Sequence, residues 1–186
     1  MSISIREKRK RETRNRLISV GVEQFAAEGY DGVSAETLCQ QASVTRGALY
    51  HHFPKGKSEL FLSVFSRLQN ELHRAVEDAG SAGSPERVIA YLMGASSSDY
   101  RRIVWEDGPQ VLGWERWREV EFGQWSGLIA DDIGQRETDR NRRVLLNAMT
   151  FGAIGELVYV VAEADDQFRT ANEASVMLQT ILKSLR

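Results

Sequence analysis

A run of hydrogen-bonding residues between Thr45 and Pro54 is the part of the chain best suited to recognising another molecule. Thr45 is a good N-cap, and Pro54 disfavours helical backbone at the residue before it, so the pattern predicts a two-turn helix over residues 46–53. Val44, Leu49 and Phe53 would face inward. The outward face would then carry Arg46, Gly47, Tyr50 and His51. Such a face fits the major groove of DNA, where side chains bind base edges.

A second short helix is predicted directly upstream, over residues 35–42. Ser34 is its N-cap, and the following Ser43-Val44 pair supplies a tight turn. Two short helices joined in this way are typical of a helix-turn-helix, although two core helices of another all-α protein would share the pattern. Lys55 and Lys57 follow the second helix, where they could bind the phosphates that flank the groove.

The block SVTRGALYHHFPKGKSELF resembles the recognition-helix signature of the TetR family of transcriptional regulators, and LISVGVEQFAAEGYDGVSAETL resembles that family's preceding helices. The resemblance covers residues 10–65. It implies a dimeric, all-helical regulator that binds a palindromic DNA operator and is released by a small molecule. Carried over by position, with the N-cap Ser34 and Lys55 added, the predicted DNA contacts are Ser34, Thr45, Arg46, Gly47, Tyr50, His51, Lys55 and Lys57.

Ser43 departs from the family pattern, because many members have glycine there. A left-handed turn position costs a residue with a side chain more energy than it costs glycine. We therefore expect the turn at Ser43 to be strained or slightly different.

Charge is divided unevenly along the chain. Residues 1–57 carry ten Lys/Arg and six Asp/Glu, a net charge of +4, whereas residues 58–186 carry fourteen and twenty, a net charge of −6. A basic N-terminal part joined to an acidic remainder suits a DNA-binding domain that carries a regulatory one. The single cysteine, Cys39, rules out an internal disulfide, and no apolar run follows the basic N-terminus, so we expect a cytoplasmic protein.

The N-terminal residues 1–11 are strongly basic and precede a predicted helix over residues 13–28, which Gly29 would end. Residues 1–11 could be a solvated tail, or an arm that contacts phosphates or the minor groove. We expect the segment to be disordered without DNA. A long apolar-faced helix over residues 58–79 would lead into the second domain. The predicted fold is all-α, with a three-helix DNA-binding domain over 1–57 and a helical ligand-binding and dimerisation domain over 58–186.

A helix predicted over residues 110–132 places several tryptophans in one apolar arc, and Arg118 and Glu121 fall inside that arc. The two charges could pair with each other at the edge of a core, which we favour, or they could anchor a ligand among the aromatic rings. Under the second interpretation the ligand would be aromatic or cationic. The candidate pocket residues are Trp105, Trp114, Trp117, Arg118, Glu121 and Trp125.

The stretch over residues 140–163 is apolar enough to approach a membrane span, but Asn147, Thr150 and Glu156 interrupt it, so we favour a buried helix. A last amphipathic helix is predicted over residues 170–185. The family resemblance implies that the last two helices form a four-helix dimer interface, and their apolar patterns fit that role. The candidate interface residues are Phe151, Ile154, Val158, Met177 and Ile181.

Residues suited to catalysis or to metal binding are not grouped in the sequence. His51 and His52 are adjacent and therefore point to different faces of a helix, and no phosphate-binding glycine loop or nucleophile motif is present. We predict no enzyme activity, no cofactor and no metal. The predicted protein is a ligand-responsive repressor whose partners are operator DNA, a second copy and an unknown small molecule. The alternative is a DNA-bound protein whose C-terminal domain recruits a protein partner.

Overall fold

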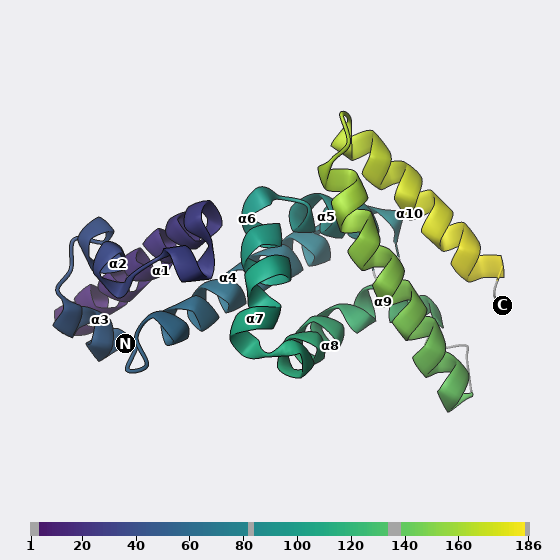
Figure 1. The fold of residues 1–186 in the computed structure, drawn as a ribbon. Helices are drawn as coiled ribbons and strands as arrows, with labels where there is room; N and C mark the ends of the chain where they lie inside the picture. The colour runs from purple at the N-terminus through teal and green to yellow at the C-terminus, as the bar shows by residue number, and fades with distance from the viewer. Residues whose placement is uncertain (1–3, 82–83, 134–138, 185–186) are drawn as a thin grey trace. The chain divides into compact units, whose positions relative to one another are not determined.

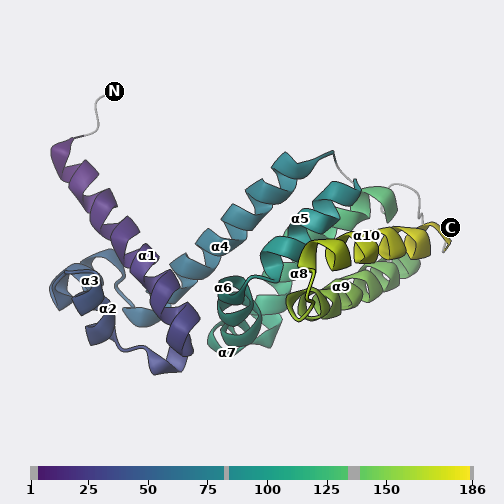
Figure 2. The same cartoon turned by 90° about the horizontal axis from the view of Figure 1, so that it is seen from above.

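The computed structural model describes residues 4–81, 84–133 and 139–184, all of which lie in helices or in the loops between them (Figures 1 and 2). The chain forms two compact units. The N-terminal unit comprises Met1–Gln69 and Asp99–Leu112, and the C-terminal unit comprises Asn70–Ser98 and Gly113–Arg186. The all-α prediction is therefore confirmed. The predicted division of the domains after residue 57 stays a prediction, and the segment 99–112 joins the N-terminal unit.

The core of the N-terminal unit is formed by α1 (Ile5–Gly32), α2 (Ala35–Gln41), α3 (Arg46–His52) and the first part of α4 (Lys57–Ala79). These helices are too short or too polar to be stable alone, and they bury a shared apolar cluster. Its fully buried members are Leu17, Phe25, Leu38, Leu49, Phe53, Leu60 and Phe61.

Helix α1 begins at Ile5, several residues earlier than expected, so the prediction of a disordered segment is wrong for residues 5–11. The reason is a capping box. The Glu7 N–H donates to Ser4 Oγ at 3.2 Å, and the Ser4 N–H donates to Glu7 Oε2 at 3.1 Å. Two of the free donors at the helix start are thereby satisfied.

The other end of α1 is kinked at Gly29, which has φ 71° and ψ 170°. A left-handed residue was expected to end the helix there, but one more turn follows to Gly32. A side chain at Gly29 would meet both a disfavoured backbone conformation and the guanidinium of Arg102. The kink therefore lets the end of α1 and the segment around Arg102 approach each other closely.

The turn between α2 and α3 has the predicted caps and the predicted left-handed residue. Ser34 Oγ accepts a hydrogen bond from the Thr37 N–H at 3.0 Å, and Thr45 Oγ1 accepts one from the Ala48 N–H at 3.2 Å. Among the described residues that are not glycine, Ser43 is the one with a positive φ, which is 52°. The expected strain at Ser43 is thus present in the backbone.

Residues 98–112 form a run of three elements, of which the middle one packs against α1. They are α6 (Ser98–Tyr100), a seven-residue π-helix η1 (Arg101–Asp107) and α7 (Gly108–Leu112). The wider π-helix η1 thus separates α6 from α7. π-Helices are rare and are found frequently at functional sites.

The C-terminal unit contains α5 (Pro85–Ala95), α8 (Trp114–Ile133), α9 (Arg140–Ala162) and α10 (Gln167–Ser184). The single helix expected over 110–132 is broken at Gly113, whose φ of 83° separates α7 from α8. Helix α5 packs against both α9 and α10. The Ser96 hydroxyl donates to the Val158 carbonyl at 2.9 Å, and the Ser175 hydroxyl donates to the Pro85 carbonyl at 3.2 Å.

Helix α9 is the one described helix that is long and apolar enough to cross a membrane by length and composition alone. Its mean hydropathy reaches 1.7, and 28% of the tested window is buried within the chain. Core helices of soluble proteins have the same character.

Replacing Ser43 by glycine should stabilise the chain. The left-handed conformation costs a residue with a Cβ about 1–2 kcal/mol, and glycine's extra freedom in the unfolded chain offsets part of the gain, so we expect a net gain of about 0.5–1 kcal/mol. Urea unfolding followed by circular dichroism measures it. Ser43→Ala, which keeps the Cβ, is the control and should give no gain. A loss of stability in Ser43→Gly would contradict strain at this turn.

Candidate nucleic-acid interface

The short helix α3 is held in place by its inward side chains. Leu49 and Phe53 are fully buried, and Phe25 and Phe61 beneath them meet edge to face at a centroid distance of 5.3 Å. The Arg14 guanidinium lies 5.1 Å from the centre of the Phe53 ring. Burial of this kind can stabilise a seven-residue helix that local interactions alone would not. The predicted inward position is confirmed for Leu49 and Phe53, whereas Val44 is half-buried.

The outward face of α3 carries the predicted recognition residues. Arg46, Gly47, Tyr50 and His51 are exposed, and Tyr50 keeps 43% of its surface open to solvent. A Cβ at Gly47 would find only the Thr45 hydroxyl oxygen, at 3.8 Å. Packing within the chain therefore does not require glycine at position 47. A close approach by another molecule would explain it.

Tyr50 is positioned by the loop that follows α3. Gly56 has φ 64°, and a Cβ at that residue would come within 3.1 Å of the Tyr50 ring. The tyrosine thus lies over a position that only glycine fills without strain. The loop thus packs against one side of the Tyr50 ring, and the rest of the ring stays accessible to solvent.

The other predicted DNA contacts divide into two groups. Thr45 and Ser34 lie at the starts of α3 and α2 with side chains near the surface, and Lys55 is exposed in the loop after α3. Lys57 is half-buried. Its Nζ donates to the Tyr30 carbonyl at 2.9 Å and lies 4.1 Å from the centre of the Tyr30 ring. The structure therefore brings the other predicted contacts together and gives Lys57 a role inside the unit.

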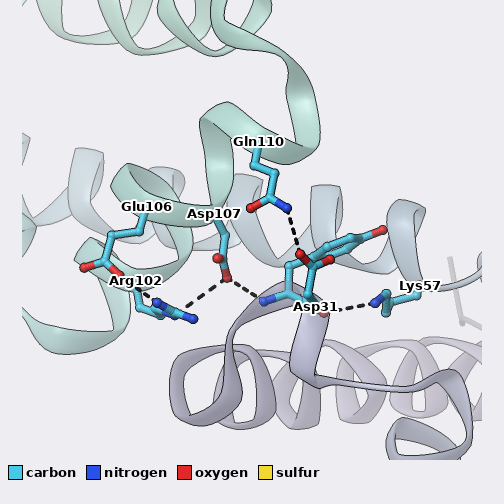
Figure 3. A network of polar contacts seen from close by, with 7 residues as sticks. Asp31, Lys57, Arg102, Glu106, Asp107 and Gln110 are labelled. Atoms are coloured by element: carbon cyan, nitrogen blue, oxygen red, sulfur yellow. Dashed lines mark hydrogen bonds and ion pairs between the residues drawn. The ribbon is translucent and has the colours of Figure 1, made fainter.

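The backbone of Tyr30, just after the kink in α1, takes part in a polar network. Figure 3 labels Asp31, Lys57, Arg102, Glu106, Asp107 and Gln110 of this network. The Tyr30 N–H donates to Asp107 Oδ2 at 2.6 Å, and the Tyr30 carbonyl accepts the bond from Lys57. Arg102 Nε lies 3.9 Å from Asp107 Oδ2, and Gln110 Nε2 donates to Asp31 Oδ2 at 2.7 Å. The network joins the end of α1 to the start of α4 and to the segment η1–α7.

Burial displaces the pKa values of Asp107 and His52 in the N-terminal unit. It raises the pKa of Asp107 above its ordinary value, although the Tyr30 N–H and the Arg102 charge act in the opposite direction. It lowers the pKa of His52, and the charges of His51, Lys10 and Arg14 lower that pKa further. Both shifts favour the neutral form of the group.

Sequence reasoning missed the Tyr30 network. The stretch Asp107-Gly108-Pro109 has the composition of a helix break, which hides the role of the carboxylate. The Tyr30–Asp107 bond joins residues 77 positions apart, and no local pattern reports such a contact. The kink at Gly29 was the available signal, because a left-handed glycine often marks a place of close approach.

The predicted ligand-pocket residues are dispersed. Trp105 lies on η1 in the N-terminal unit, and the others lie on α8. Trp114 is 61% exposed and stacks on the buried Trp117 at a centroid distance of 5.1 Å. Arg118 is exposed, whereas Glu121 is fully buried. The ion pair described on this helix joins Arg116 and Glu119 at 2.7 Å.

Glu121 belongs to a buried aromatic cluster of the C-terminal unit. Burial raises the pKa of the Tyr91 hydroxyl well above its usual value, and the Glu121 charge raises it further. Trp125 meets the Tyr91 ring edge to face at 4.6 Å, and His73 lies 5.8 Å from Trp125. His73 also lines an open depression of about 580 Å³ between α4 and α8, with Asn70, Glu119 and Gln124.

The predicted dimer-interface residues fall on two sides of their helices. Ile154 and Val158 are buried within the chain, so they are not available to a partner. Phe151 is half-buried, and Met177 and Ile181 are exposed. The apolar side chains of α9 and α10 that are exposed are Val144, Leu145, Met149, Val160, Phe168, Val176, Met177 and Ile181.

Two short capped helices, the second with a polar outward face and a buried apolar one, define a helix-turn-helix regulator that binds DNA. The sequence matches the family model "Bacterial regulatory proteins, tetR family" over residues 17–64 and the model "Tetracyclin repressor-like, C-terminal domain" over residues 82–185. The chain belongs to the TetR family of transcriptional regulators. The predicted family is confirmed, and so is a regulatory rather than an enzymatic protein.

Similar proteins include two from Pseudomonas putida. The HTH-type transcriptional regulator TtgW is 35% identical over 89 residues, which are 47% of this chain and 66% of that protein. The regulator SrpR is 35% identical over 88 residues, or 47% and 41% of the two chains. The aligned region spans less than two thirds of either relative. A TetR-family regulator from Pectobacterium atrosepticum has 28% identity and a TM-score of 0.66 over 96% of both chains.

Replacing Asp107 by asparagine should change how stability depends on pH. A carboxyl with a raised folded-state pKa binds more protons in the folded chain, so its contribution to stability falls as pH rises from below about 4 through the folded pKa. The asparagine side chain could still accept the Tyr30 bond. We therefore expect the stability of the wild type relative to Asp107→Asn to fall over this rise in pH. Urea unfolding at several pH values measures the difference, and an opposite slope would contradict the burial of a costly charge.

Proposed function

We propose that the protein is a ligand-responsive repressor of the cytoplasm that binds a palindromic operator as a homodimer. The observation that carries the proposal is the exposed polar face of α3, with a glycine at position 47 that packing within the chain does not require. In this proposal Arg46 and Tyr50 bind base edges, and Gly47 allows the helix to approach them closely. Ser34, Thr45, His51 and Lys55 bind phosphates and set the register.

The second copy would bind the exposed apolar face of α9 and α10. Several large apolar side chains lie on these two helices, and such a surface is costly to leave in water. A two-fold dimer places two α3 helices one or more turns of DNA apart, in successive major grooves. The same face could instead bind a different protein, which is the alternative function.

The effector would bind in the C-terminal unit. The depression between α4 and α8, together with the adjacent cluster of Glu121, Tyr91 and Trp125, supports an aromatic or cationic ligand. Binding would favour a conformation of the dimer in which the spacing of the two α3 helices no longer matches the groove repeat. Helix α4 belongs to both units and is the element through which we expect the response to pass.

The direct test is binding of the purified chain to the DNA upstream of its own gene across a salt series, with footprinting. A protected palindrome and a steep loss of affinity with salt are expected. Weak binding with no footprint boundary at that DNA would contradict an operator there, and pull-down experiments would then test the partner-recruiting alternative.

Replacing Arg46 by alanine should reduce specificity. A bidentate contact to a base contributes about 1–3 kcal/mol, so affinity for the operator should fall roughly tenfold to a hundredfold, and affinity for random DNA far less. Fluorescence anisotropy with the two duplexes measures both affinities. Lys55→Ala is the control, because losing a phosphate contact should weaken both duplexes equally. Equal losses in Arg46→Ala would contradict base reading.

Replacing both Met177 and Ile181 by glutamate should separate the dimer, because four buried charges would face one another across the two-fold axis. Light scattering after size-exclusion chromatography measures the mass. Leu62→Glu, at an exposed apolar position of α4, is the matched control and should stay dimeric. A wild-type chain that is monomeric at micromolar concentration would contradict the proposed homodimer and favour a different protein partner.

A further inference from the structure

The first turns of α1 are helical although they bury almost nothing. Residues 4–12 are exposed, and the buried part of the helix begins only at Leu17. Figure 2 shows these turns extending beyond α2 and α3. The capping box at Ser4 and Glu7 holds their start in helical form. The domain core therefore does not account for this part of the helix.

The exposed turns carry a stripe of cations on the side that faces α3. Arg6, Lys10 and Arg14 are spaced by four residues, so they lie along one face of the helix. Arg14 fixes the direction of that face, because its Nη2 donates to Ser63 Oγ at 3.1 Å and its guanidinium lies over Phe53. We call Arg6, Lys10 and Arg14 the basic stripe.

The basic stripe is close to the end of α3. The charges of Lys10 and Arg14 both act on the His52 imidazole, and His52 is the last residue of α3. The stripe thus continues the exposed surface that carries Tyr50 and His51. A molecule that lies along the outer face of α3 would meet the stripe next.

The stripe is not neutralised within the described part of the chain. Arg6 and Lys10 form no ion pair there, and the one carboxylate in this turn, Glu7, accepts the Ser4 N–H. Like charges four residues apart destabilise a helix slightly. A polyanion lying along the stripe would remove that repulsion, and DNA phosphates have the required charge and spacing along a groove.

We propose that the basic stripe is a preformed second DNA contact, which binds the phosphate backbone beside the major groove that α3 enters. The proposal rests on the proposed function, because it needs α3 to be in the groove. Charge complementarity and continuity with the α3 surface identify the occupant as duplex DNA. The contact is to phosphates, so it adds affinity without base preference.

The test compares two double variants that remove equal charge. Arg6→Gln/Lys10→Gln removes two cations of the stripe, whereas Lys8→Gln/Arg11→Gln removes two from another face of the same turns. Arg14 is left in place because it also packs in the unit. Glutamine has a helix propensity close to those of lysine and arginine, and circular dichroism checks that helicity is unchanged. Fluorescence anisotropy on the footprinted duplex is measured across a salt series.

Log affinity falls linearly with log salt, and each lost phosphate contact reduces the magnitude of that slope by about 0.9. The stripe variant should reduce the magnitude of the slope by about 1.8 per protomer, because two such contacts are lost. The control variant should have a slope close to that of the wild type. Equal slopes for the two variants would overturn the proposal, because net charge alone would then explain the effect. A wild-type chain without a footprint would instead contradict the proposed function itself.

Discussion

The DNA-binding unit depends on the contacts that hold the end of α1 against its neighbouring helices. Tyr30 makes these contacts with both its backbone and its ring. Its N–H is bound by Asp107, its carbonyl by Lys57, and its ring packs against Phe61 at a centroid distance of 5.1 Å. Gly29, directly before Tyr30, interrupts the helical backbone with φ 71° and ψ 170°, and the Tyr30 N–H is bound by Asp107 instead of by the preceding turn. One residue therefore holds α1, the start of α4 and the segment η1–α7 in a fixed arrangement.

That arrangement lets a very short helix present a polar face. Helix α3 has seven residues and would not be stable alone, so its order comes from burying Leu49 and Phe53 on α1 and α4. Because the inward side chains supply the stability, the outward side chains remain exposed to another molecule, which we propose is DNA. Gly47 fits this division between the two faces, because no neighbour within the chain requires a glycine at that position. In the proposed function, positioning and recognition are thus carried by opposite faces of one helix.

Local chemistry predicted the two short helices well, because their caps and breaks lie in adjacent residues. Ser34, Thr45 and the residue before Pro54 mark the bounds of α2 and α3 to within a residue or two, and the departure at Ser43 predicted its positive φ. The capping box of Ser4 and Glu7 could also be identified in the sequence, but the basic run after it was interpreted as a disordered arm.

Contacts between distant residues could not be predicted, since no local pattern indicates that Asp107 bonds to Tyr30 or that Lys57 turns inward. Periodicity also cannot say which apolar side of α9 packs inside the chain, and so Ile154 and Val158 are buried while Met149 and Val160 are exposed.

Hydrogen–deuterium exchange of the full chain, with and without a duplex that carries the footprinted site, tests the account most directly. Stabilisation of α3 and of the first turns of α1 by bound DNA should slow amide exchange over residues 5–16 and 45–57, and exchange in α9 and α10 should be the same in both samples at constant dimer content. Slowed exchange confined to α9 and α10, with none in α3, would contradict DNA recognition by the face described here.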